Sequence, residues 1–256
     1  MTRLPLHGLS ILVTRPKNQA ERLARVIEHA GGEAIVFPTI EIQPIADDAA
    51  LRTMVKQLDR YHMAIFVSAN AVEQSMPFLA AGGANSSALI FAAIGQATKK
   101  ALHDFGVANV LAPTERYDSE ALLNLPEMHD VKDKQIIIFR GDGGREVLAQ
   151  TLRDRGATVD SAICYRRVRP QPDTSGLQAR WNTGNIHAVS AMSLESLTNL
   201  YDILDESTRR LLAVTPVLVP HPRIAEAAQK LGLTRVRVTG THDDDLIKEL
   251  SLIHAG

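Results

Sequence analysis

Short runs of consecutive hydrophobic residues alternate along the chain with segments in which hydrophobic residues recur every three or four positions. The continuous runs, such as residues 9–14 and 135–139, are typical of strands that are buried on both faces of a sheet. The periodic segments, such as residues 71–79 and 145–155, predict amphipathic helices. Strict alternation of strand and helix predicts an α/β protein with parallel sheets.

Two extended segments interrupt this alternation. Residues 38–44 begin and end with proline, and residues 164–172 contain two prolines near their end. The strand before the second segment is expected over residues 158–162, and a short helix is expected over residues 119–125. Both extended segments are predicted to be connectors.

The chain also repeats itself. Four segments of the first half have counterparts in the second half, in the same order and 122–126 residues further on. Such a repeat predicts two lobes of similar fold that arose by internal duplication, and a cleft between lobes is a common place for a small-molecule site. The paired segments are those around Arg15 and Arg140, FVSANAVE and AVSAMSLE, residues 95–106 and 221–232, and YDSEALL and HDDDLIK.

Two domain arrangements fit this order of elements. In the first, each half of the chain is one domain, with the boundary near residues 126–134. In the second, the chain crosses over at both connectors, so that each lobe combines segments of the two halves. The extended character of the connectors slightly favours the second arrangement.

Composition excludes several classes of protein. The 256 residues carry 28 basic and 29 acidic side chains, so a net charge of −1 provides no basic field for nucleic acid. No apolar run approaches the roughly 20 residues that span a bilayer, and the first residues lack the apolar region of a signal peptide. The single cysteine, Cys164, excludes an internal disulfide and favours the cytoplasm.

Candidate chemistry lies in the loops that follow the predicted strands, because ligands of parallel sheets bind beyond the carboxyl ends of the strands. These loops contain hydroxyls, amides and a few cations, but no metal-ligand set or strong nucleophile. Free N–H groups at helix starts bind anions, so an anionic ligand is expected. The candidate binding residues are Arg15, Ser68, Asn70, Gly95, Thr98, Arg140, Gly141, Arg145, Ser190, Ser193 and His221.

Several of these residues have a second interpretation. Each of the serines and Asn70 is equally suited to cap a helix. The GDGG segment lacks the glycine spacing of a dinucleotide site, and the three aspartates at 243–245 fit a helix start better than a metal site. Tyr165 differs from these, because its neutral phenol is able to donate a proton. The alternative is that Tyr165 packs in a hinge.

The sequence resembles the uroporphyrinogen-III synthase family over essentially its whole length. The resemblance rests on the order and spacing of short segments. These are ILVTRP (11–16), FVSANAV (66–72), AIGQAT (93–98), YDSE (117–120), RGDGGR (140–145) and YR (165–166).

The resemblance implies two flavodoxin-like, three-layer αβα lobes joined by a two-stranded linker, with segment crossover. Lobe 1 then comprises residues 1–38 and 172–256, lobe 2 residues 45–163, and the linkers residues 39–44 and 164–171. It implies a lyase of haem biosynthesis that cyclises hydroxymethylbilane, a linear tetrapyrrole with eight carboxylates, to uroporphyrinogen III. Water is lost, the last ring is inverted, and no cofactor takes part.

Within the family's pattern, Tyr165 is the residue expected to help the hydroxyl group leave, and Ser68, Thr98, Ser119 and Ser190 are expected to contact substrate. Pro220 departs from the pattern because it removes a backbone N–H before His221. No nucleic-acid or membrane partner is expected, and a monomer is expected. The competing hypotheses are a two-lobed binding protein for an anionic small molecule and a nucleotide-binding regulator.

Overall fold

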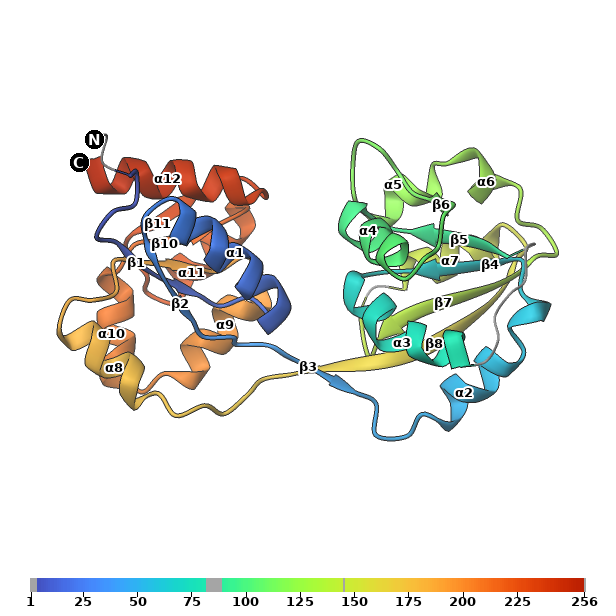
Figure 1. The fold of residues 1–256 in the computed structure, drawn as a ribbon, viewed down its shortest axis with the longest axis horizontal. Helices are drawn as coiled ribbons and strands as arrows, with labels where there is room; N and C mark the ends of the chain where they lie inside the picture. Colours follow the sequence, from blue (N-terminus) through green and yellow to red (C-terminus); the bar gives the residue numbers. More distant parts are fainter. Residues whose placement is uncertain (1–3, 82–88, 145, 256) are drawn as a thin grey trace. The chain divides into compact units, whose positions relative to one another are not determined.

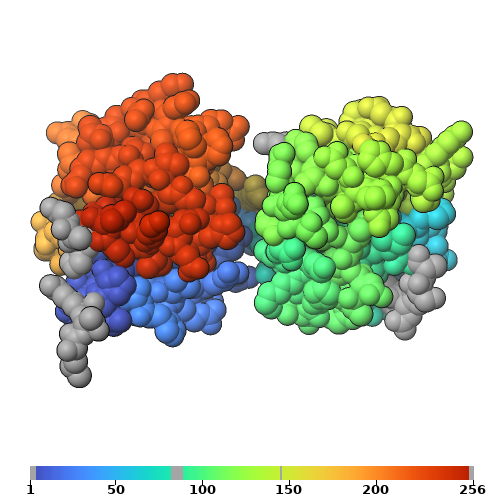
Figure 2. Space-filling model, turned by 90° about the horizontal axis from the view of Figure 1, so that it is seen from above, coloured from blue at the N-terminus to red at the C-terminus, as the bar shows by residue number. Residues whose placement is uncertain are grey.

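The structure is a computed structural model that describes residues 4–81, 89–144 and 146–255. The chain divides into two compact units (Figure 1). Unit 1 comprises residues 1–41 and 168–256, and unit 2 comprises residues 42–167. In Figure 2 the blue N-terminal segment and the red C-terminal segment pack together in unit 1.

Unit 1 contains a five-stranded sheet in the order β2-β1-β9-β10-β11, and every pair of neighbours is parallel. The strands are β1 (Ser10–Val13), β2 (Glu33–Val36), β9 (Ala188–Ser190), β10 (Val217–Val219) and β11 (Val236–Val238). The helices are α1 (Lys17–His29), α8 (Ser175–Asn182), α9 (Leu194–Ile203), α10 (Glu206–Val214), α11 (Pro222–Lys230) and α12 (Asp243–Ala255).

Helices cover both faces of this sheet. Side chains alternate along a strand, so β1 contributes to two hydrophobic cores. Ile11 and Val13 join a core with α1 and α12, whereas Leu12 joins a core with residues of α8, α9, α10 and α11. All four residues of β1 are buried, which explains why the strand consists almost entirely of apolar residues.

Unit 2 contains a six-stranded sheet in the order β3-β8-β7-β4-β5-β6. The pairs from β8 to β6 are parallel. The strands are β3 (Glu41–Pro44), β4 (Met63–Phe66), β5 (Ile90–Ala93), β6 (Val110–Leu111), β7 (Gln135–Gly141) and β8 (Thr158–Val168). The helices are α2 (Ala49–Lys56), the 3-10 helix η1 (Leu58–Arg60), α3 (Ala69–Ala81), α4 (Gln96–Asp104), α5 (Ser119–Leu123), α6 (Pro126–His129) and α7 (Val147–Asp154).

The sheet of unit 2 also lies between two helical layers. Ile65, Ile136 and Ile138 join a core with α5, α6 and α7. Phe66 and Phe139 face α3 and α4 on the other side, with their rings stacked at 4.7 Å between centroids. The predicted α/β class with parallel sheets is therefore confirmed.

Two predicted element boundaries are wrong. The strand expected over residues 158–162 continues to Val168, so the first part of the predicted connector is sheet and Tyr165 lies on β8. Its polar and charged residues obscured the strand in the sequence, but pairing with β7 sustains it as far as Tyr165. The helix expected over residues 119–125 ends at Leu123, and α6 begins at Pro126 because proline favours the first helical position.

Candidate active site

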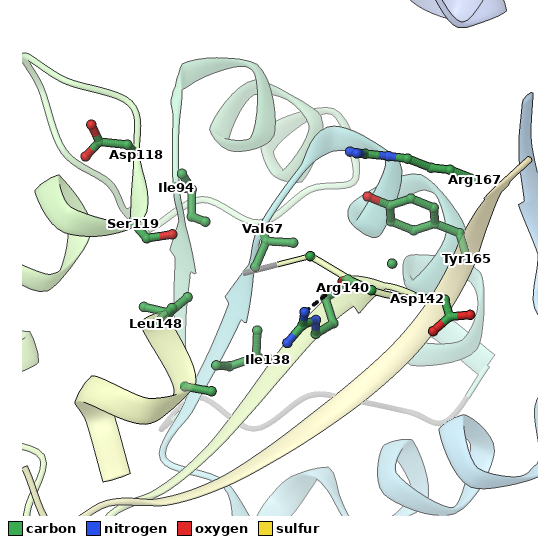
Figure 3. Close-up of a pocket in the computed structure, with 14 residues that line it drawn as sticks. Val67, Ile94, Asp118, Ser119, Ile138, Arg140, Asp142, Leu148, Tyr165 and Arg167 are labelled. Atoms are coloured by element: carbon green, nitrogen blue, oxygen red, sulfur yellow. Dashed lines mark hydrogen bonds between the residues drawn. The ribbon is translucent and has the colours of Figure 1, made fainter. Parts of the chain in front are cut away.

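A cavity of about 470 Å³ lies in unit 2 at the carboxyl ends of β4, β5, β7 and β8 (Figure 3). Its lining combines five apolar side chains with two arginines, two aspartates, a serine and a tyrosine. The lining residues are Val67, Ile94, Asp118, Ser119, Ile138, Arg140, Gly141, Asp142, Gly143, Gly144, Leu148, Ala149, Tyr165 and Arg167.

An irregularity in the pairing of β7 with β8 places Tyr165 at this cavity. Ile163 lies opposite Arg140, but the next residue of β7, Gly141, lies opposite Tyr165, so Cys164 is an extra residue in β8. The backbone N–H of Asp142 donates to the carbonyl of Tyr165 at 2.7 Å and closes the ladder beyond the bulge. Such bulges redirect the side chains that follow them.

The aromatic ring of Tyr165 lies directly on Gly141. A Cβ atom at position 141 would stand 2.7 Å from both Cε2 and Cζ of the ring. The absence of a side chain at Gly141 is therefore what allows the ring to occupy this place. Gly141 was predicted to bind substrate, and the structure places it beneath the predicted catalytic residue, on the cavity wall.

The hydroxyl of Tyr165 contacts Ser68, at the start of α3. The two oxygens, Oη of Tyr165 and Oγ of Ser68, are 3.0 Å apart. The same Oγ accepts a hydrogen bond from the backbone N–H of Ala71 at 3.0 Å, which is the pattern of a helix N-cap. Tyr165 is only 2% exposed, so its hydroxyl is held in a largely dry environment.

Arg140 is the buried cation of the cavity. Its side chain is 8% exposed; Nη1 donates to the carboxylate of Glu146 at 2.6 Å and Nη2 donates to the carbonyl of Gly143 at 2.7 Å. These bonds tie the arginine to the loop that follows β7. Arg145, also predicted in this loop, lies outside the described residues.

The other predicted residues of unit 2 lie at helix starts. Asn70 and Thr98 are buried in the first turns of α3 and α4, and Gly95 immediately precedes α4. Ser119 begins α5 and lines the cavity, while the carboxylate of Asp118 caps that helix by accepting from the N–H of Ala121 at 2.8 Å. Of the predicted residues, those that line the cavity are Ser119, Arg140, Gly141 and Tyr165.

The four predicted residues of unit 1 lie at the ends of its strands or at the starts of the helices that follow them. Arg15 pairs with the carboxylate of Asp243 at 2.8 Å. Ser193 caps α9, and Nδ1 of His221 accepts from the N–H of Arg223 at 3.2 Å, so both serve as N-caps. Ser190 is fully buried at the end of β9, and its hydroxyl has no partner among the described residues.

Three polar residues of the cavity were missed in the sequence: Asp118, Asp142 and Arg167. The signals were present, because Asp118 lies within YDSE and Asp142 within RGDGGR, and Arg167 belongs to the arginines beside Tyr165. In Figure 3 the side chains of Tyr165 and Arg167 extend in the same direction from β8. Two residues apart on one strand, they share a face of the sheet.

Cys164 does not belong to the cavity. It is buried, and its thiol points to the carbonyl of Arg140, 3.2 Å away. Burial raises the pKa of the Cys164 thiol to about 12. A thiol that stays protonated at neutral pH is a poor nucleophile, so Cys164 packs the core of unit 2.

Three further observations outside the cavity bear on the class of protein. The aspartates at 243–245 belong to the first turn of α12, where Asp245 accepts from the N–H of His242 at 3.2 Å. No group of three His, Cys, Asp or Glu side chains within residues 4–81, 89–144 and 146–255 is arranged to hold a metal ion. Across the same residues, no helix has the length and apolar character to cross a membrane.

The fold and the cavity define an α/β protein with two sheets, each built from parallel strands. The sheet of unit 2 presents a buried phenol and a buried guanidinium at the carboxyl ends of its strands. Comparison with known proteins makes the class specific. Residues 21–247 match the family model described as "Uroporphyrinogen-III synthase HemD". The chain belongs to the uroporphyrinogen-III synthase family.

Individual relatives agree with this assignment. The chain is 32% identical over 241 residues to the uroporphyrinogen-III synthases of Salmonella typhimurium and Escherichia coli, covering 93% of this chain and 98% of each relative. Solved structures of uroporphyrinogen III synthases from Thermus thermophilus (15% identity, TM-score 0.61) and Helicobacter pylori (14% identity, TM-score 0.56) share the fold. They cover 96% and 95% of this chain and 99% and 98% of their own.

Proposed function

We propose that this chain catalyses the reaction of its family, the conversion of hydroxymethylbilane to uroporphyrinogen III in haem biosynthesis. Water is lost and the last pyrrole ring is inverted, which makes the chain a lyase. The observation that carries the proposal is the family match over residues 21–247. The buried phenol of Tyr165 at the cavity of unit 2 supports it chemically.

Departure of the hydroxyl group is the step to which Tyr165 contributes. The C–O bond breaks with its electron pair on oxygen, and the phenol proton moves to that oxygen to form water. The resulting azafulvenium cation is attacked by the substituted carbon of the last pyrrole to form a spiro intermediate. The bond between this carbon and its original methylene bridge then breaks, and closure through the other α-carbon of the ring leaves the ring inverted. Ring closure releases a proton from carbon, which returns to the phenolate of Tyr165.

The rest of the catalysis is orientation of the substrate. Electron-rich pyrroles supply both the nucleophile and the electrophile, so the protein has to fold the chain and favour one closure. Proximity and orientation contribute about 7–11 kcal/mol in favourable cases. This chemistry needs no cofactor.

The eight carboxylates of the substrate are assigned to hydroxyls, cations and helix starts. Arg140 and Ser119 offer donors on the wall of the cavity, and Arg140 has further N–H groups beyond those that bind Glu146 and Gly143. The remaining proposed binding residues are Arg15, Asn70, Gly95, Thr98, Gly141, Arg145, Ser190, Ser193 and His221.

The finer architecture is also a proposal. When β7 and β8 are matched to β1 and β2, and β4, β5 and β6 to β9, β10 and β11, both sheets have the flavodoxin-like order. This supports internal duplication with segment crossover and a two-stranded linker of β3 and β8. The division after residues 41 and 167 falls within the predicted linkers, 39–44 and 164–171. A cytoplasmic monomer remains the expected state.

The experiment is an isomer assay. The protein is incubated with hydroxymethylbilane, the products are oxidised, and the uroporphyrin isomers are separated. Isomer III in excess of the amount formed without protein is the expected result. Isomer I alone, the product of spontaneous closure, would contradict the proposal and would favour the alternative of a binding protein for an anionic small molecule.

A further inference from the structure

We propose that Ser68 is a positioning residue that acts through Tyr165, rather than a contact for substrate. The inference rests on the proposed function, because it assigns a role in the same proton transfer. Three observations carry it: the contact between the two hydroxyls, the anchoring of Ser68 to α3, and the place of Ser68 outside the cavity wall.

Either hydroxyl can donate in the contact between Ser68 and Tyr165. Ser68 Oγ already accepts the N–H of Ala71 at 3.0 Å. A serine hydroxyl has one proton to donate and two lone pairs, so one lone pair is occupied by the helix. The remaining lone pair and the proton are available to Oη of Tyr165, 3.0 Å away.

This arrangement matches what the phenol requires during the reaction. When the phenol proton moves to the departing hydroxyl, the phenol oxygen becomes negative and needs a donor. The O–H of Ser68 can then donate to it, and the bond from Ala71 N–H to Ser68 Oγ strengthens that donation because linked hydrogen bonds polarise one another. Helix α3 is 13 residues long, and the partial positive charge at its amino end also favours the negatively charged phenol oxygen.

Ser68 and Gly141 fix the phenol from two sides. The ring rests on Gly141, whose Cα leaves room for it, while the hydroxyl is held by Ser68. Tyr165 and Gly141 both line the cavity, and Ser68 is not among its lining residues. Ser68 is therefore placed to orient the phenol of Tyr165 at the cavity.

The kinetic test uses Ser68→Ala, Ser68→Thr and Tyr165→Phe, assayed by formation of isomer III. Ser68→Ala is expected to lower kcat by about tenfold with KM changed by less than about twofold, since it removes a transition-state contact. Ser68→Thr keeps a hydroxyl at a half-buried position and is expected to restore most of kcat. In the Tyr165→Phe background, Ser68→Ala is expected to have almost no further effect, as for coupled residues.

The control for folding is Asp205→Ala. Asp205 caps α10 in unit 1 by accepting from the N–H of Thr208 at 2.7 Å. Ser68→Ala and Asp205→Ala each remove a helix cap, and each is expected to lower the melting temperature by about 2–4 °C. Only Ser68→Ala is expected to lower kcat, so the loss of a cap and the loss of the tyrosine contact are distinguished.

A spectroscopic measurement tests the contact without the reaction. The chain has four tyrosines, and labelling their Cζ atoms with carbon-13 gives signals that respond to hydrogen bonding at Oη. Tyr165→Phe assigns the signal of Tyr165. Ser68→Ala is expected to shift this signal and leave the other three in place, and Ser68→Thr is expected to shift it less.

Each failure has a distinct meaning. A protein that forms no isomer III overturns the proposed function, while the carbon-13 signals still report the contact. An unchanged Tyr165 signal in Ser68→Ala overturns the positioning role. Two further outcomes would also overturn the positioning role, because each would show that Ser68 contacts the substrate directly. The first is that Ser68→Ala lowers kcat by the same factor in the wild type and in Tyr165→Phe. The second is that Ser68→Ala changes KM alone.

Discussion

Units 1 and 2 each carry an arginine at the carboxyl end of a central strand, but the two arginines have different partners. In unit 1, Arg15 pairs with Asp243 at the start of α12. In unit 2 the repeat makes Asp118 the counterpart of Asp243, yet Arg140 pairs with Glu146 instead. In unit 1 an ion pair links the arginine and the aspartate. In unit 2 the corresponding side chains, Arg140 and Asp118, both line the cavity.

Ser68 and Ser190, which occupy matching positions of the sequence repeat, also differ in their partners. Ser68 contacts Tyr165, whereas its counterpart Ser190 is buried with no partner among the described residues. The residue 25 positions after Arg15 is Ile40, which is buried and apolar, and the residue 25 positions after Arg140 is Tyr165. The comparison teaches that two sheets of the same strand order carry different side chains at matching positions, and that the proposed proton donor, Tyr165, belongs to unit 2.

Removal of the phenol is expected to have the largest effect. Tyr165→Phe should lower kcat more than tenfold, since general acids typically contribute about 10²–10⁴-fold, while the melting temperature stays close to that of the wild type. Steady-state formation of isomer III measures the effect. Tyr201→Phe, a tyrosine of unit 1, is the matched control and should keep full activity; an equal loss in both variants would remove the distinction between the units.

Displacement of the ring is expected to have the next largest effect. Gly141→Ala places a methyl group 2.7 Å from two ring atoms of Tyr165, so the phenol has to move and kcat should fall by about tenfold. Gly176→Ala is the control, because a Cβ at that position of α8 meets nothing within 4 Å. Wild-type kcat in Gly141→Ala would show that the exact place of the ring is unimportant.

The ion pair of unit 1 is expected to matter for stability. Asp243→Ala leaves Arg15 without its partner in a largely buried place, and the free energy of unfolding should fall by about 2 kcal/mol. Urea denaturation measures the change. The neighbouring Asp244 is exposed, so Asp244→Ala should change stability by less than about 0.5 kcal/mol. Similar values for both variants would mean that Arg15 is not held by Asp243.

The smallest effect concerns Cys164 and appears only at high pH. Burial raises the pKa of its thiol from 9.0 to about 12. Below pH 9 the folded and unfolded states both keep the proton; above it the unfolded state loses the proton first, so stability falls as pH rises towards 12. Cys164→Ser should lack this contribution, at most about 1.4 kcal/mol per pH unit, and should remain active.

Denaturation midpoints of the wild type and Cys164→Ser between pH 8 and 10.5 measure this difference. Parallel curves for the two proteins would contradict the raised pKa of the thiol. Complete inactivity of a folded Cys164→Ser at pH 7 would instead indicate a thiol mechanism.

The sequence was sufficient for the α/β class, because buried parallel strands such as β1 and β7 require continuous apolar runs. It was insufficient for β8, whose second half mixes Cys164, Tyr165 and two arginines and carries a bulge that no local pattern reveals. Candidate residues could be found as loop residues after strands.

Their partners could not be found in this way. The contacts of Tyr165 with Gly141 and Ser68 depend on the register of β7, β8 and the start of α3, which lie far apart in the chain. A serine that caps a helix and a serine that holds a phenol look the same in a sequence. Ser68 does both.

The proposed donation of a proton by Tyr165 is tested most directly by measuring the single-turnover rate of water loss from hydroxymethylbilane in H₂O and in D₂O, with viscosity matched. If Tyr165 transfers a proton as the C–O bond breaks, the wild-type rate falls in D₂O, and Tyr165→Phe is slow in both solvents. Equal wild-type rates in the two solvents, together with an unimpaired Tyr165→Phe, would contradict proton donation by this residue.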